Sequence, residues 1–269
     1  MGRKVILVGC GNMGHAMLKG WLDGALAPAD VAVVEPTEAL RTRAAGLGVT
    51  AVASADALPA GGDVVVFAVK PQAIGEVAPA YRAHVAAGAT VVSVAAGIGV
   101  ATFEELLGRQ APVIRCMPNT PAAIGKGMMV LFANRHVDGD TFGFVEALMA
   151  RSGAVATIDN EALMDAVTAV SGSGPAYVFH FIECLTEAGT QAGLPRETAA
   201  QLAMQTVYGA ACLARESGEA PGRLREQVTS PNGTTAAALA VLMGENRLLE
   251  LVDEAVAAAK KRSVELGKS

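Results

Sequence analysis

The stretch at residues 5–14, VILVGCGNMG, decides the fold. Its first four residues, Val5–Val8, are apolar and β-branched or Leu, which is typical of a strand buried on both faces of a parallel sheet. The glycines that follow fit the pattern G-x-G-x-x-G and open a helix candidate, which is the context that a dinucleotide-binding loop needs. Gly9 permits the tight turn, Gly11 lets the backbone approach a pyrophosphate, and Gly14 allows the helix to pack closely on the strand. Free N–H groups and the helix dipole favour the phosphate charge. We therefore expect cofactor contacts from Gly9, Cys10, Gly11, Asn12, Met13 and Gly14, the alternative being a glycine-rich turn without a ligand.

Strand and helix candidates alternate through the first 160 residues. The strand candidates are short runs rich in Val or Ile: Val5–Val8, Val31–Val34, Val64–Val69, Thr90–Val94, Val113–Cys116, Met128–Phe132 and Val155–Ile158. Helical stretches lie between them, such as Met13–Asp23, Glu38–Leu47 and Phe142–Ala150. This rhythm predicts an α/β fold, with a doubly wound Rossmann-like dinucleotide-binding domain over residues 1–160.

Helical stretches rich in Ala and Leu replace the β-branched runs after about Glu161. They are Ala162–Val170, Ala176–Ala192, Glu197–Glu216 and Arg247–Leu266, and they predict an all-α domain over residues 161–269. About a hundred residues give a poor ratio of surface to volume for such long apolar faces. We therefore expect a homodimer formed mainly through this half, with a self-sufficient small bundle as the alternative.

Composition and charge exclude several classes of protein. Among 269 residues, 52% are apolar and 17% are charged, so a disordered polyelectrolyte is excluded. The net charge of −5 argues against non-specific nucleic-acid binding. No apolar run approaches the ~20 residues of a membrane span, and the first one is too short for a signal peptide. The four cysteines lie far apart, so we expect reduced core residues, no metal site and a cytoplasmic protein.

Residues at the ends of other strand candidates are further cofactor candidates, because ligands of such sheets bind beyond the carboxyl ends of the strands. Glu35 can accept a hydrogen bond from the adenosine ribose, which favours NAD, whereas Arg41 and Arg43 could turn toward a 2′-phosphate; ordinary solvated surface charges are the alternative for all three. Ala96 and Gly97 would leave room for a nicotinamide ring. A further candidate is the run Ala68, Val69, Lys70 and Pro71, in which the Lys70 side chain could supply a cation. A contact from the Lys70 backbone to the cofactor is equally expected, because Pro71 forces Lys70 out of helical geometry.

Three further motifs point to a family. They are RCMPNTP at residues 115–121, SGSGPAY at 171–177 and VTSPNGTT at 228–235. The third can form an anion-binding nest whose hydroxyls point into a cleft, or it can be a helix cap with Thr234 or Thr235 as the N-cap residue. Together with G-x-G-x-M-G and A-V-K-P, in the same order, these motifs closely resemble the pyrroline-5-carboxylate reductase family over nearly the whole chain.

The resemblance implies reduction of 1-pyrroline-5-carboxylate to L-proline, the final step of proline biosynthesis, with NADP(H) or NAD(H). The nicotinamide ring would lie near Ala96, Gly97, Pro118 and Asn119. Backbone N–H groups of Ser230, Gly233 and Thr234 would hold the substrate carboxylate, and the Thr235 hydroxyl would bond the ring nitrogen. Because a threonine hydroxyl is a weak acid, Thr235 is expected to orient the nitrogen rather than act as a general acid. Family members also place the cleft at a dimer interface and form rings of dimers.

Three positions depart from the family pattern. Asn232 stands where glycine is usual, Ala55 stands near a usual asparagine that Ser54 could replace, and Glu35 departs from the small or basic residues typical of NADP-preferring members. These departures leave the cofactor preference open. One rival is a β-hydroxyacid dehydrogenase, but the stretch 171–177 has no lysine within one helical turn to serve as its acid/base. A second rival is a non-enzymatic dinucleotide sensor; a DNA-binding one would need a basic helix-turn-helix segment, and none is apparent.

Overall fold

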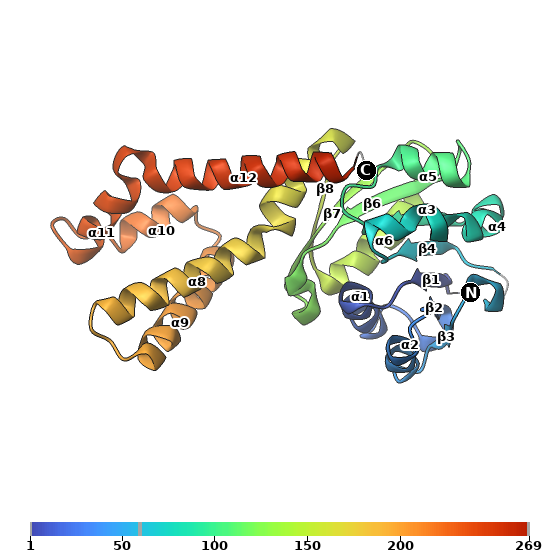
Figure 1. Ribbon diagram of the computed structural model, residues 1–269, viewed down its shortest axis with the longest axis horizontal. Coiled ribbons are helices and arrows are strands. Elements are labelled where there is room, and N and C mark those ends of the chain that lie inside the picture. The colour runs from blue at the N-terminus through green and yellow to red at the C-terminus, as the bar shows by residue number, and fades with distance from the viewer. Residues whose placement is uncertain (1, 59–60, 268–269) are drawn as a thin grey trace. The chain divides into compact units, whose positions relative to one another are not determined.

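An eight-stranded sheet forms the N-terminal half of the chain in a computed structural model, which describes residues 2–58 and 61–267 (Figure 1). The strands are β1 Val5–Val8, β2 Val31–Val34, β3 Thr50–Val52, β4 Val64–Phe67, β5 Thr90–Ser93, β6 Val113–Met117, β7 Gly127–Ala133 and β8 Gly153–Thr157. Their spatial order is β3-β2-β1-β4-β5-β6-β7-β8, and the six strands from β3 to β6 are parallel. This is the order of a doubly wound dinucleotide-binding sheet, so the predicted fold class is confirmed.

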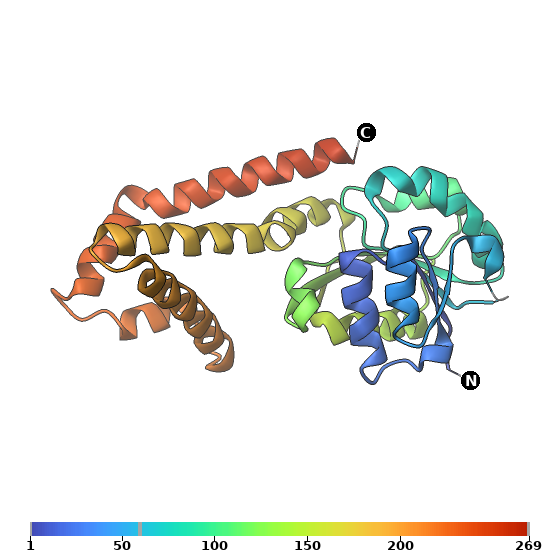
Figure 2. The same ribbon diagram turned by 60° about the horizontal axis from the view of Figure 1, so that its bottom comes forward.

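Helices cover both faces of this sheet. They are α1 Asn12–Leu22, α2 Glu38–Ala45, α3 Ile74–Val77, α4 Arg82–Ala86, α5 Val100–Leu107 and α6 Gly139–Met149. Figure 2 shows α1 and α2, drawn in blue, on the near side of the sheet. Leu7 of β1 packs in the same buried cluster as Trp21 of α1, whereas its neighbour Ile6 packs in the opposite cluster with Phe103 of α5. The unbroken apolar run of β1 is therefore explained by burial on both sides.

The last two strands run against the rest of the sheet. β7 pairs antiparallel with β6, and only the short turn Thr120–Ile124 connects them. An antiparallel partner can follow a short turn, whereas a parallel partner needs a long crossover. β8 follows α6 and pairs parallel with β7. The sequence pattern located both strands but did not predict their direction, and it missed β3, which has only three residues.

The described residues divide into two compact units, of which one contains 2–173 with 259–267 and the other contains 174–258. The helices after the sheet are α7 Met164–Val167, α8 Gly174–Gln191, α9 Arg196–Glu216, α10 Pro221–Gln227, α11 Thr234–Met243 and α12 Arg247–Leu266. A π-helical turn, Thr168–Gly172, ends the first stretch of the first unit. This division differs from the expected one at residue 160, because residues 161–173 and the end of α12 pack with the sheet although their composition is helical.

The second unit has a very small core of its own. Its buried residues are Thr186, Ala199 and Ala203. Gly189 lets α8 approach α9, because a Cβ there would lie 3.2 Å from the Ala199 Cβ. Large apolar side chains are instead exposed, among them Phe179, Met204, Tyr208, Val241, Leu249 and Leu251. Exposed apolar surface on this scale is typical of a protein–protein interface. Within the described residues, no helix has both the length and the apolar character that crossing a membrane requires.

Candidate functional site

The glycine loop between β1 and α1 leaves its backbone open to a ligand. Gly9 has φ of 88°, and a Cβ there would lie 2.8 Å from the Ala68 carbonyl oxygen. A Cβ on Gly14 would collide with the Gly9 carbonyl oxygen, so the helix packs against the loop as closely as it does only because Gly14 has none. A Cβ on Gly11, in contrast, would meet nothing within 4 Å. The loop is therefore tight on its inner side and open at Gly11.

The first turn of α1 presents its N–H groups to that open side. Gly11 is the N-cap residue, no side chain accepts a hydrogen bond there, and the first turn contains no acidic residue. The first N–H groups of a helix have no partner within the helix, and the helix dipole adds positive potential at this end. The pyrophosphate of a dinucleotide fits such a site.

Glu35, directly after β2, fixes the glycine loop from within the protein. Its Oε2 accepts a hydrogen bond from the Cys10 backbone N–H at 2.8 Å, and its Oε1 accepts one from the Thr37 N–H at 2.9 Å. The residue is only 6% exposed. The sequence predicted Glu35 as a partner of the ribose, and the structure adds that both its oxygens already hold backbone donors. A carboxylate oxygen can accept a second hydrogen bond, so the two roles are compatible.

Two arginines of α2 complete this cluster through backbone carbonyls. Arg43 donates from Nη2 to the Cys10 oxygen at 2.7 Å and to the Gly11 oxygen at 3.2 Å. Arg41 donates from Nη1 to the oxygens of Glu35 and Pro36 at 3.0 and 2.9 Å. The Arg41 guanidinium therefore lies at the end of β2 and that of Arg43 at the glycine loop. The sequence offered both as groups that could turn toward an adenosine 2′-phosphate.

Burial favours the uncharged forms of two titratable groups in and beside the loop, Cys10 and His15. Burial is the main cause that raises the pKa of the Cys10 thiol to about 11, with Arg43 lowering it and Glu35 raising it further. Since the thiolate is the reactive form of cysteine, Cys10 is inert here. Burial, then the charges of Arg43 and Lys19, lower the pKa of His15. The positive potential that a phosphate meets therefore comes from the helix end and the arginines.

Two more strand ends share the edge of the sheet at which the glycine loop lies. β1, β4 and β5 are adjacent and parallel, so their carboxyl ends meet at one edge. Lys70, after β4, has an extended backbone and is exposed. Gly97, after β5, has φ of 78°, a left-handed conformation that glycine adopts readily. The structure thus brings together the predicted residues 9–14, 68–71 and 96–97.

Asn119 uses its amide within the protein. Its Oδ1 accepts from the Met128 N–H at 2.8 Å, and its Nδ2 donates to the Ser171 carbonyl at 3.1 Å. A Cβ on Gly172 would lie 2.5 Å from the terminal methyl group of Met117. The RCMPNTP and SGSGPAY motifs therefore pack on each other. Asn119 was predicted as a nicotinamide contact, and its amide here ties the end of β6 to β7 and to the second motif.

The stretch 230–235 runs from the connection after α10 into the first two residues of α11, in the second unit. Asn232 has φ of 59°, a left-handed conformation that Asn tolerates better than most residues, so the loop keeps its turn without the glycine usual at this position. Gly233 is the N-cap residue of α11 and no side chain caps the helix. The alternative in which Thr234 or Thr235 is the N-cap residue is therefore wrong.

The backbone donors of this loop differ in availability. The Gly233 N–H donates to the Ser230 carbonyl oxygen at 3.0 Å, which closes the turn. Thr234 and Thr235 are the first two residues of α11, so their N–H groups have no partner within the helix. The N–H groups of Thr234 and Thr235 are therefore the ones that the start of α11 can offer to an anion, whereas the Gly233 N–H is engaged in the turn.

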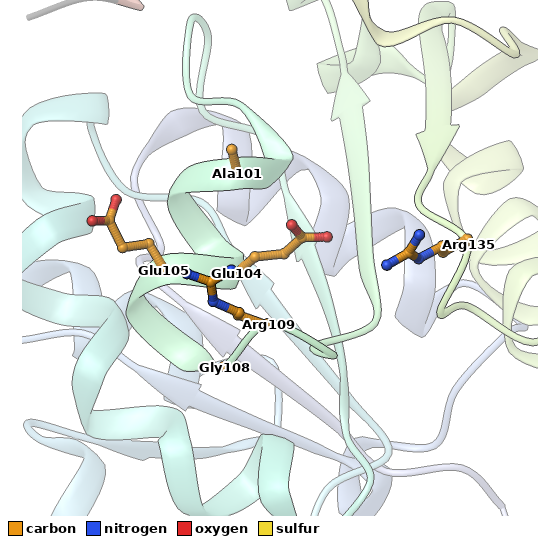
Figure 3. A pocket seen from close by; sticks show the side chains of 6 residues that line it. All are labelled: Ala101, Glu104, Glu105, Gly108, Arg109 and Arg135. Atoms are coloured by element: carbon orange, nitrogen blue, oxygen red, sulfur yellow. The ribbon is translucent and has the colours of Figure 1, made fainter.

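One hollow on the first unit is separate from these residues (Figure 3). It has a volume of about 570 Å³ and is lined by residues of α5 and its end, together with Arg135 after β7: Ala101, Glu104, Glu105, Gly108, Arg109 and Arg135. None of the predicted site residues lines it. Within the residues that the structure describes, no three His, Cys, Asp or Glu side chains gather as metal ligands.

Comparison with known proteins gives a consistent result. Residues 161–266 match the family model described as pyrroline-5-carboxylate reductase dimerisation, and residues 4–97 match that of coenzyme F420-dependent NADP oxidoreductases. A pyrroline-5-carboxylate reductase of Pseudomonas aeruginosa is 41% identical over 98% of this chain and 96% of its own. The Escherichia coli enzyme is 35% identical over the full length of both chains. The solved structure of such a reductase from Coxiella burnetii superimposes with a TM-score of 0.95 at 35% identity over the whole of both chains. The Plasmodium falciparum structure with NADP bound gives 0.85 at 29% identity over 98% of each.

Proposed function

The chain belongs to the pyrroline-5-carboxylate reductase family, and from that premise we propose that it reduces 1-pyrroline-5-carboxylate to L-proline with NADPH or NADH, the final step of proline biosynthesis. The observation that carries the proposal is the match at 41% identity to a reductase of that name along almost the whole chain. The open glycine loop and the uncapped start of α11 are the parts of the structure that support it.

The first unit holds the dinucleotide in this proposal. A bound reduced nicotinamide supplies a hydride. Residues 9–14 bind the pyrophosphate through backbone N–H groups, and residues 68–71 and Ala96, Gly97 and Pro118 line the remainder of the cofactor site. Asn119 supports this site by fixing the end of β6, as its two hydrogen bonds indicate.

The loop of the second unit holds the substrate. Backbone N–H groups at Ser230, Gly233 and Thr234 bind the carboxylate, and for Gly233 this requires the turn to Ser230 to open. The Thr235 hydroxyl donates to or accepts from the ring nitrogen and so orients it. When the hydride arrives at the imine carbon, a C–H bond forms and the π electrons of C=N move to nitrogen, which takes a proton from solvent. Positioning of the two reactants contributes up to ~7–11 kcal/mol in favourable cases.

The kinetic test is the oxidation of NADH and NADPH at 340 nm with 1-pyrroline-5-carboxylate and with a panel of keto acids. We expect turnover of the cyclic imine and no turnover of the keto acids. Turnover of the keto acids without turnover of the cyclic imine would indicate a β-hydroxyacid dehydrogenase. Binding of nucleotide with no turnover of any substrate would indicate a sensor.

The predicted partner of the helical half is a second copy of this chain. The family model that matches residues 161–266 describes dimerisation, and the second unit exposes its large apolar side chains. We further propose rings of dimers, a cytoplasmic location and no nucleic-acid or membrane partner, in accord with the net charge of −5.

Substitution of Leu249 by Glu is expected to weaken the dimer. Leu249 is 67% exposed on α12, so the change places a charge on the apolar face at little cost to the isolated chain. The dissociation constant of the dimer should rise by at least about tenfold, which corresponds to ~1.4 kcal/mol, in sedimentation equilibrium. The neighbouring exposed Glu250→Gln variant is the control. Equal dissociation constants for Leu249→Glu, Phe179→Glu and the native chain would contradict dimerisation through this face.

Substitution of Glu35 by Ser is expected to shift the cofactor preference toward NADPH. The change removes a charge that repels a 2′-phosphate and leaves Arg41 and Arg43 beside it. The ratio of kcat/KM for NADPH to that for NADH should rise about tenfold, and both values should fall because the loop loses two hydrogen bonds. Glu38→Ser removes an equal charge from the first turn of α2 and should leave the ratio unchanged. An unchanged ratio in Glu35→Ser would show that Glu35 has no part in nucleotide choice.

A further inference from the structure

Gly267, the residue after α12, packs directly on the loop that follows β5. Gly267 lies one residue beyond α12, and a Cβ built on it would lie 2.6 Å from the Gly97 carbonyl oxygen. A Cβ built on Gly97 would lie 3.2 Å from the Gly267 nitrogen. Two glycines far apart in the sequence thus let two backbones touch, with no side chain between them.

A buried hydrogen bond holds the last turn of α12 in this place. Ser263 is 5% exposed, and its Oγ donates to Oδ1 of Asp165 at 2.6 Å. The Gly267 N–H in turn donates to the Ser263 carbonyl at 3.2 Å. The position of Gly267 against Gly97 therefore depends on Asp165, which lies on α7.

The same short helical stretch also holds the other end of the Gly97 loop. Oε1 of Glu161 accepts from the Val100 N–H at 2.8 Å, where α5 begins, and from Nη1 of Arg115 at 2.7 Å. Arg115 is only 8% exposed, so this ion pair is rigidly placed. Glu161 lies in the 3-10 turn Glu161–Leu163, which leads directly into α7 with Asp165. Glu161 thus fixes the end of the Gly97 loop where α5 begins, and Asp165 fixes the end of α12, which places Gly267 against Gly97.

We infer that Asp165 and Gly267 are positioning residues for the nicotinamide half of the cofactor. The inference rests on the proposed function, which puts the nicotinamide ring beside Ala96 and Gly97. Gly97 holds φ of 78°, and the contact with Gly267 restricts the alternative conformations that a glycine otherwise samples. A loop held in one conformation before binding loses less entropy when the ring docks, and so binds it more tightly.

Two variants test the contact and one tests its rescue. Gly267→Ala places a methyl group against the Gly97 carbonyl oxygen, and Asp165→Ala removes the acceptor for Ser263. Asp165→Asn keeps an oxygen that can accept the same hydrogen bond. Glu265→Ala is the matched control on α12, because that side chain is 48% exposed and pairs with the exposed Arg262. A chain that ends at Leu266 removes Gly267 and places the charged α-carboxylate on Leu266.

The readout is binding without turnover. The protein has one tryptophan, Trp21 of α1, so energy transfer from Trp21 to a bound reduced nicotinamide reports the Kd of NADH and NADPH in the absence of substrate. The Kd of ADP-ribose and of its 2′-phosphate, which lack the nicotinamide, is measured by calorimetry.

We expect Gly267→Ala, Asp165→Ala and the shortened chain to raise the Kd of NAD(P)H about fivefold to thirtyfold while the Kd of the ADP-ribose ligands changes less than twofold. Asp165→Asn and Glu265→Ala should match the native chain. An unchanged Kd for NAD(P)H in all three variants, or an equal loss for the ADP-ribose ligands, would overturn the inference. If the native chain does not reduce the cyclic imine, the proposed function is wrong. That outcome is distinct from an unchanged Kd in the variants, which would overturn only the inference.

Discussion

Thr235→Ala is expected to lower kcat/KM for 1-pyrroline-5-carboxylate by about tenfold to a thousandfold. The variant removes one hydrogen bond of ~1.5–4 kcal/mol between the hydroxyl and the ring nitrogen. Thr235 lies in the first turn of α11, where Gly233 already serves as N-cap residue, so the helix does not need the hydroxyl as a cap. The melting temperature should therefore change little, and the loss of activity should appear in kcat.

Two variants separate this role from a general effect on the loop. Thr235→Ser keeps the hydroxyl and should retain activity within about threefold of the native value. Thr229→Ala removes a hydroxyl that donates to the Arg225 carbonyl at 2.6 Å, outside the proposed carboxylate site, and should change kcat/KM less than twofold. A native rate in Thr235→Ala would remove this residue from the mechanism.

Gly14→Ala should weaken binding of the dinucleotide strongly. The new Cβ would collide with the Gly9 carbonyl oxygen, so either the glycine loop or α1 must move. Overpacking of this kind typically costs about 1–3 kcal/mol of stability, and the moved loop no longer presents its N–H groups to the pyrophosphate. We expect the Kd of NADH and NADPH to rise more than about a hundredfold in calorimetry, with a lower melting temperature.

Gly75→Ala is the matched control for that substitution. Gly75 also lies in a helix of the first unit, α3, but a Cβ there would meet nothing within 4 Å. Replacement of an unstrained helical glycine by alanine commonly stabilises a protein by ~0.4–1 kcal/mol. Gly75→Ala should therefore bind the nucleotides as the native chain does. Native affinity in Gly14→Ala would show that the loop is not the pyrophosphate site.

Local pattern was enough to predict seven of the eight strands and the glycine loop. Val5–Val8 and Val31–Val34 are strands with the predicted bounds, because a buried parallel strand leaves an unbroken apolar run in the sequence. The fold class follows from their alternation with helices. The direction of β7 could not be predicted in this way, because it depends on the length of the connection to β6. The turn at Thr120–Ile124 has no sequence signature that separates it from a loop leading into a helix.

Contacts between distant motifs could not be predicted from spacing. Asn119 was assigned to the cofactor from its motif, yet its amide bonds Ser171, 52 residues later. Glu35 was assigned to the ribose, yet it also holds the Cys10 N–H. The contact of Gly267 with Gly97 joins the residue after α12 to the sheet edge. In each case two polar or backbone groups meet only after the chain has folded. The sequence around one of them does not indicate which residue the other will be.

The most direct measurement of the central claim is a crystal structure of the chain with L-proline and an oxidised nicotinamide nucleotide. We expect the proline carboxylate to lie about 3 Å from backbone N–H groups within residues 230–234. The ring nitrogen should lie at hydrogen-bond distance from the Thr235 hydroxyl. We also expect the nicotinamide beside Gly97 and the pyrophosphate at Gly11. Proline bound away from residues 230–235, with that loop serving only to begin α11, would contradict the account.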